Sequence, residues 1–212
     1  WVLPLPSSVE PGPCLRHFLN EVDLSGSTKL TALGDEAFYR SALAKIVLPS
    51  GLQEIGARCF LYCDRLRGVF LNEGLRAMGQ GCFALCTSLK TITVPESVSF
   101  VGESCFRECT KLETVTLPSQ LIVLQPSTFA RCRSLQTIVL PSELQQIGQH
   151  CFIDCFNLTT VEVPQHVKII QAAAFSLCTN LTSITFKEGS KLAIVQQGAF
   201  EYCTALTAIT FP

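Results

Sequence analysis

The chain has 212 residues, of which 48% are hydrophobic, and its formal net charge at pH 7 is −1. This apolar fraction is ample for an ordered core. Because the basic and acidic residues are almost equal in number, the sequence lacks the positive field that attracts nucleic acid, and we expect no nucleic-acid partner. No apolar run approaches the roughly 20 residues that span a bilayer, so we also expect no membrane insertion by this segment.

The first 29 residues match the rest of the chain poorly. Four prolines fall within the first 13 residues, and proline lacks the amide hydrogen that helices and strands use. Leu19, Val22 and Leu24 fit the strand pattern of the later repeats only in part. We therefore expect residues 1–29 to form an irregular N-terminal cap with a degenerate first strand. Residues 30–212 are expected to form one repeat domain, as a segment of a longer protein.

From residue 30 onward, the sequence repeats about every 23 residues. The clearest column is phenylalanine, at Phe38, Phe60, Phe83, Phe106, Phe129, Phe152, Phe175 and Phe200. Cysteine follows three residues later in seven of these eight repeats, and leucine follows three residues after that position in seven. Such periodicity is typical of a solenoid, in which each unit buries its apolar side only by stacking on its neighbours. We expect about eight stacked units.

Each unit predicts three elements in chain order. Thr114–Leu117 alternates polar and apolar residues, which indicates a short strand with one buried face, and Pro118 ends it. Leu124 belongs to an apolar column that precedes each Phe and predicts a second short strand. Residues 103–109 place Cys, Phe and Cys on one face of a helical turn. A glycine four residues before several of the phenylalanines is expected to ease the backbone into that turn.

Residues 30–212 resemble the BspA-type leucine-rich repeat family, whose unit reads approximately L-x-x-I-x-I-P-x-x-V-x-x-I-G-x-x-A-F-x-x-C-x-x. Leu112 to Cys132 carries nearly the whole pattern, and residues 186–192 match a longer variant of the unit. The resemblance implies an α/β, horseshoe-like leucine-rich repeat solenoid and a role in protein recognition. It implies no catalytic residues. The sequence departs from the family pattern where cysteine replaces the usual alanine before Phe, at Cys59, Cys82, Cys105 and Cys151.

Twelve cysteines are the strongest chemical signal in the chain. A regular ladder of disulfides is disfavoured because the column after Phe holds seven cysteines, an odd number, although a few bridges stay open as an alternative. Metal sites usually contain C-x2-C pairs, whereas the pairs in this sequence are C-x3-C. The thiol of Cys151 lies next to His150 in the sequence, but a nucleophilic site would also need a third group to orient the histidine. We therefore expect cysteine to fill small buried sites as a weakly polar hydrophobe, with no metal or other cofactor. Unpaired thiols favour a reducing compartment.

Partner binding by a solenoid depends on its outward columns. Most outward positions of the main strands hold threonine, which β-propensity explains, but Lys45, Val47 and Phe70 should form a small apolar patch. A second column lies six residues before each Phe and consists of Glu54, Ala77, Phe100, Val123, Gln146, Ile169 and Ile194. If the second strand alternates, the apolar members of this column face outward, and exposed apolar surface of this kind usually marks a protein contact. The alternative is a register shifted by one residue, with the column buried.

These observations predict a protein–protein interaction or scaffold module, not an enzyme. The candidate partner-binding residues are Ala77, Phe100, Val123, Ile169 and Ile194 on the second strands, with Lys45, Val47 and Phe70 on the main strands. The alternative function is that of an extracellular or cell-surface adhesin or receptor-like domain. Asn157 and Asn180 begin glycosylation acceptor patterns that would fit this alternative, but asparagine is also favoured in turns.

Overall fold

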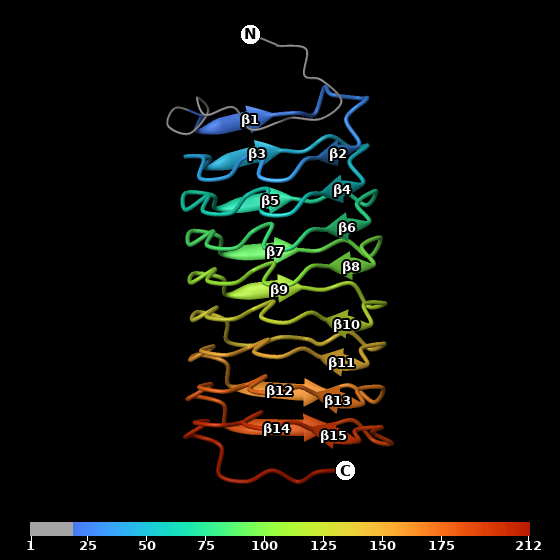
Figure 1. Ribbon diagram of the computed structural model, residues 1–212, viewed down its shortest axis with the longest axis vertical. Helices are drawn as coiled ribbons and strands as arrows, with labels where there is room; N and C mark the ends of the chain where they lie inside the picture. The colour runs from blue at the N-terminus through green and yellow to red at the C-terminus, as the bar shows by residue number, and fades with distance from the viewer. Residues whose placement is uncertain (1–18) are drawn as a thin grey trace.

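The computed structural model describes residues 19–212, in which short parallel strands stack along one axis (Figure 1). Each repeat forms one coil and contributes to two rows of strands. The main strands are β1 (Glu21–Asp23), β3 (Lys45–Val47), β5 (Gly68–Phe70), β7 (Thr91–Thr93), β9 (Thr114–Thr116), β12 (Thr160–Val163) and β14 (Ser183–Phe186). The second strands are β2 (Ala32–Leu33), β4 (Glu54–Ile55), β6 (Ala77–Met78), β8 (Phe100–Val101), β10 (Val123–Leu124), β11 (Gln146–Ile147), β13 (Ile169–Ile170) and β15 (Ile194–Val195). The predicted leucine-rich repeat solenoid is therefore confirmed, while residues 1–18 of the expected cap lie outside the described residues.

Strand pairing is interrupted within both rows. The main strands pair as β1-β3-β5, β7-β9 and β12-β14, and the second strands as β2-β4-β6-β8 and β10-β11-β13-β15. Between β9 and β12 the chain passes through residues 138–140 outside any strand, and Thr137 makes an isolated parallel bridge to Thr160. Thr137 is therefore bridged to the β12 side, and no strand ladder joins residues 138–140 to β9.

The third side of each coil is not helical, and the predicted helical turn is wrong for residues 19–212. Two residues in each coil adopt the left-handed backbone, two positions before and two after Phe, as Ser104 (φ 56°) and Glu108 (φ 59°) do around Phe106. The amide of Phe106 donates to the carbonyl of Thr128 in the next coil at 2.9 Å, while the amide of Arg107 donates to Ser104 in its own coil at 3.0 Å. Left-handed backbone costs about 1–2 kcal/mol per non-glycine residue. Hydrogen bonds between coils offset this cost, because they satisfy amides that would otherwise be buried without a partner.

The glycines four residues before Phe are required by close packing between coils. A Cβ atom built on Gly102 would lie 2.6 Å from backbone atoms of Gly79 and Gln80, a separation that side-chain carbons cannot occupy. Gly102 itself does not have a left-handed φ. Glycine is therefore present at this position because neighbouring coils pack too closely for a side chain, and not because it eases a turn as expected.

A stack of phenylalanine rings runs through the core. Neighbouring ring centroids lie 5.0–5.9 Å apart and neighbouring planes are within 10° of parallel. The six rings from Phe60 to Phe175 are fully buried. Because each ring contacts one ring above and one below, the stack joins the coils along the whole axis.

The cysteines fill the space beside this stack. The eleven cysteines among the described residues are unbridged and buried, while Cys14 lies outside those residues. Seven of them donate the thiol hydrogen to the carbonyl of Phe in the preceding coil at 3.1–3.2 Å, as Cys132 does to Phe106. Burial raises the pKa of the Cys63 thiol to about 11 and that of Cys132 well above its usual value. These side chains therefore act both as small hydrophobes and as neutral hydrogen-bond donors.

Candidate functional site

From β2 to β13 the second strands present one outward residue in each coil, while in β15 both Ile194 and Val195 are exposed. In β8 the side chain of Phe100 is 48% exposed while Val101 is buried, and in β6 Ala77 is half-buried while Met78 is fully buried. The same alternation holds at Val123 and at Ile169, which are both half-buried. The structure therefore has the register in which this column faces outward.

We call Ala77, Phe100, Val123, Ile169 and Ile194 the second-strand stripe. Ala77 is the register partner of Phe100, and Ile169 is the register partner of Ile194. Gln146 pairs with both Val123 and Ile169, so it divides the stripe into two apolar segments. No ladder joins β8 to β10 within the described residues, although Phe100 and Val123 occupy consecutive coils.

The predicted main-strand patch is also brought together. Val47 is the register partner of Phe70, which is 87% exposed, and Lys45 is the partner of Gly68. Nothing lies within 4 Å of a Cβ atom built on Gly68, so the surface at this position is open. The patch continues onto β1, where Asp23 is the partner of Val47.

Asp23 forms an acidic edge of this patch. Hydrogen bonds from Ser25, and to a smaller extent the charge of Lys45, hold the pKa of the Asp23 carboxyl below its usual value. Asp23 therefore stays ionised at neutral pH and places a negative charge beside the apolar patch.

A third feature surrounds Val139 and was not singled out from the sequence. The Val139 side chain is 85% exposed. Two hollows, of about 490 Å³ and about 440 Å³, are both lined by Val139, Leu140 and Ser142. The sequence feature that could have indicated this site is Val139 itself, because Thr116 and Thr185 occupy the equivalent outward position in other coils.

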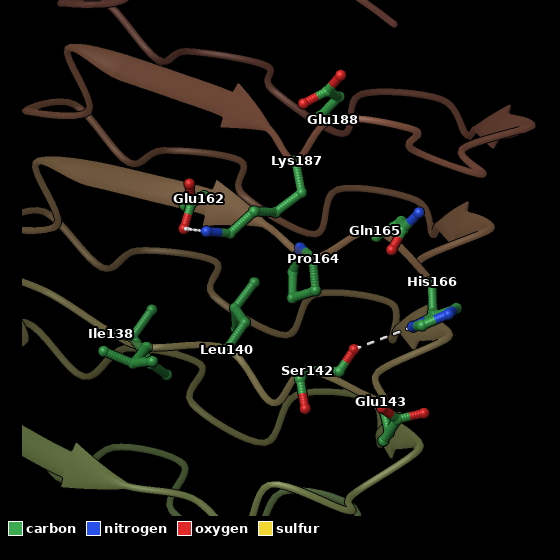
Figure 2. Close-up of a pocket in the computed structure, with 11 residues that line it drawn as sticks. Ile138, Leu140, Ser142, Glu143, Glu162, Pro164, Gln165, His166, Lys187 and Glu188 are labelled. Atoms are coloured by element: carbon green, nitrogen blue, oxygen red, sulfur yellow. Dashed lines mark hydrogen bonds and ion pairs between the residues drawn. The ribbon is translucent and has the colours of Figure 1, made fainter.

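The larger hollow has an apolar floor and a charged rim, as Figure 2 shows. On the rim, the Lys187 Nζ atom lies 3.0 Å from a carboxylate oxygen of Glu162. The His166 Nδ1 atom lies 3.3 Å from the carbonyl oxygen of Ser142. The carboxylates of Glu143 and Glu188 form no ion pair within residues 19–212. The rim therefore carries an excess of negative charge.

The turn side of the coils carries polar and ring contacts between neighbouring coils. Arg131 lies 3.1 Å from Glu108 and 3.5 Å from Asp154, which links three consecutive coils. The Arg40 guanidinium lies over the Tyr62 ring, 4.9 Å from its centroid. A hollow of about 490 Å³ also lies on this side, lined in part by Ala57, Tyr62 and Leu85.

Residues 19–212 contain neither a cluster of metal-ligand side chains nor a membrane-spanning helix. This part of the chain contains no group of three or more His, Cys, Asp or Glu side chains arranged to hold a metal ion. It also contains no helix that is long and apolar enough to cross a membrane.

Solved structures with the same fold come from several bacteria. The leucine-rich repeat protein of T. pallidum is 28% identical over 82% of this chain and 82% of its own, with a TM-score of 0.74. A leucine-rich repeat protein from Eubacterium ventriosum is 20% identical over 91% of this chain and 59% of its own, with a TM-score of 0.72. A third, from Bacteroides ovatus, is 23% identical over 91% of this chain and 67% of its own, with a TM-score of 0.63.

The family assignment follows from the sequence. No functionally curated protein matches this chain. The model of the BspA type leucine rich repeat region matches residues 16–113 and 100–212, with six copies, and it covers nearly the whole chain. The chain therefore belongs to the BspA-type leucine-rich repeat family.

Proposed function

We propose that this chain is a protein-binding module that holds a partner protein, or another domain of a larger assembly, on the second-strand stripe. The observation that carries the proposal is that an outward column of apolar side chains lies directly over the packed core. Phe100 is half-exposed. Its neighbour Val101 is buried in the core, and so is Leu124, which follows Val101 in the inward column of the next coil. Apolar side chains fixed in this way lose little conformational freedom on binding.

Phe100 is the expected centre of this contact. Aromatic residues are enriched among the positions that dominate binding energy. Complete burial of an exposed Phe side chain contributes about 1.5–3 kcal/mol, so burial of the remaining half of Phe100 should contribute about 1 kcal/mol. Ile122, which is 51% exposed, follows in the next coil beside Val123 and extends the apolar area.

The test compares three variants with the unmodified chain in affinity capture from cell extract. The Phe100→Asp variant, alone and combined with Ile169→Asp, should retain the urea unfolding midpoint of the unmodified chain and lose its captured partner. Thr93→Asp is the matched control, because Thr93 is also an exposed outward strand residue but lies outside the stripe. Capture that survives in both stripe variants would show that the stripe is not the binding surface.

Recognition at a cell surface is the alternative function, and one observation favours it. Asn157 and Asn180 are exposed, and their side-chain amides lie 3.4 Å apart on adjacent coils, so both acceptor patterns are accessible. The unbridged cysteines favour a reducing compartment instead. Mass spectrometry of the native protein separates the two: glycans at these asparagines support the surface function, and free thiols without glycans support the intracellular module.

A further inference from the structure

The surface around Val139 has the shape of a two-part trough. We use the name Val139 trough for the two hollows and the exposed Val139 between them. The smaller hollow lies between the coil that carries Val115 to Ser119 and the coil that carries Val139 to Ser142. The larger hollow extends from the Val139 coil across Glu162 and Pro164 to Lys187 and Glu188. The trough therefore runs along the stack and crosses the ends of the main strands.

The trough lies where the ladder of main strands is interrupted. β9 ends its sheet, and residues 138–140 are not paired to it. The two segments leave between them the hollow of about 440 Å³. Leu117 and Leu140, which line this hollow and belong to the core columns, are buried. The floor of the hollow is thus apolar, and the exposed apolar side chain beside it is that of Val139.

The spacing of the hollows selects the conformation of an occupant. Adjacent coils are separated by about 4.8 Å, which is the distance between paired strands. The smaller hollow is lined by two coils and the larger one by three, with the Val139 coil shared. At this coil spacing the midpoints of the two sets of lining coils are about 7 Å apart along the stack. In an extended peptide, side chains two residues apart point to the same face and are separated by about 6.6–6.8 Å. An extended segment along the stack can therefore place alternate side chains in the two hollows.

The charges on the rim of the larger hollow favour basic residues next to the apolar residues of the bound segment. Lys187 is neutralised by Glu162 at 3.0 Å, and the free carboxylates of Glu143 and Glu188 remain beside the larger hollow. The smaller hollow is lined by no charged residue. Lysine or arginine next to the apolar residue in the larger hollow would meet these carboxylates.

We propose that the Val139 trough binds an extended peptide segment of a partner protein, with two aliphatic side chains two residues apart and a flanking lysine or arginine. The peptide lies along the stack and crosses the Val139 side chain, with one aliphatic group in each hollow. This site is separate from the second-strand stripe, which is formed by other strands of the same coils. A partner long enough to cover both surfaces would contact each through a different part of its chain.

The experiment uses a synthetic peptide with two leucines separated by one serine and flanked by lysines. Binding is followed at low salt by the NMR shift of the Val139 methyl groups and by calorimetric titration. Two comparison peptides replace the lysines by glutamates or the leucines by serines. We expect saturable shifts with the lysine–leucine peptide, at least tenfold weaker binding of each comparison peptide, and a loss of affinity as salt screens the carboxylates.

Protein variants separate the trough from non-specific attraction. Val139→Lys places a charged side chain at a solvent-exposed position, so it should leave unfolding unchanged and weaken peptide binding at least tenfold. Thr93→Lys adds the same charge in the same outward column two coils away from Val139 and should change affinity less than twofold. Equal effects of these two variants, or equal binding of the lysine and glutamate peptides, would overturn the proposal. Phe100→Asp should bind the peptide normally, so failure here is distinguishable from failure of the stripe.

Discussion

The phenylalanine stack gives the sharpest test of the fold. Phe106 is fully buried, and its ring centroid lies 5.9 Å from that of Phe83 and 5.4 Å from that of Phe129. Phe106→Ala removes both ring contacts and leaves a cavity that neighbouring coils cannot fill without moving. Substitutions of this kind cost about 3–5 kcal/mol, which is a large part of the 5–15 kcal/mol that typically stabilises a folded protein.

The assay is urea unfolding followed by far-ultraviolet circular dichroism, with Phe70→Ala as the matched control. Phe70 has the same side chain but is 87% exposed, so its removal should change the free energy of unfolding by less than about 0.5 kcal/mol. Because a solenoid couples each repeat mainly to its neighbours, Phe106→Ala should also broaden the transition as the two halves separate. A loss below about 1 kcal/mol, or equal losses for the two variants, would refute the assignment of Phe106 to the core.

Three further substitutions test the effect of backbone geometry and of a buried thiol on stability. Gly68→Ala should raise the free energy of unfolding by about 0.5–1 kcal/mol, because glycine weakens a strand and the added Cβ meets nothing within 4 Å. Gly81→Ala should lower it by about 1 kcal/mol in the same urea titration, because Gly81 has a φ of +59°; a common sign for both variants would contradict this reasoning. Since burial raises the pKa of Cys63 from 9.0 to about 11, its stabilisation is complete below pH 9 and is lost as pH rises toward 11. Cys63→Ala should therefore reduce the fall in the thermal midpoint between pH 9 and 11, and an unchanged fall would exclude Cys63 as a cause.

The repeat period predicted the fold because every coil must satisfy the same packing requirement. Phe, Leu and the β-branched strand residues recur in columns since each column stacks directly on itself in a parallel solenoid. The cysteines were predicted to be inert packing residues for the same reason. Their hydrogen bonds, such as that from Cys132 to the carbonyl of Phe106, depend on the path of the preceding coil and could not be inferred from spacing.

The helical turn was predicted wrongly because side-chain spacing does not determine backbone dihedrals. Cys105, Phe106 and Cys109 face the core, as a helical turn would require, yet Ser104 and Glu108 adopt left-handed φ values. Tertiary hydrogen bonds to the next coil decide between the two conformations. Only Gly81 and Gly198, at the position occupied by Ser104 in its coil, indicate in the sequence that left-handed backbone occurs there.

The stripe and patch residues were placed on outward columns by alternation alone, whereas the trough required the structure. Phe70 and Phe100 stand out by side-chain type in their columns. The hollows beside Val139 lie where no ladder joins residues 138–140 to β9. Thr137–Leu140 differs from the strand-forming segment Thr114–Leu117 only by Ile138 and Val139, and both residue types favour strands. A break in pairing depends on the relative position of two coils, which a periodic pattern does not encode.

The identity of residue 139 is not required by the solenoid. Threonine occupies the equivalent outward position at Thr93, Thr116 and Thr185, and it has nearly the shape and β-propensity of valine. At a side chain that is 85% exposed, Val139→Thr should change the free energy of unfolding by less than about 0.5 kcal/mol. The same substitution removes the apolar contact between the two hollows, so it should weaken the lysine–leucine peptide severalfold in the calorimetric titration. If affinity stays constant while the fold is intact, the hollows do not bind through Val139; if stability falls instead, the valine serves the fold.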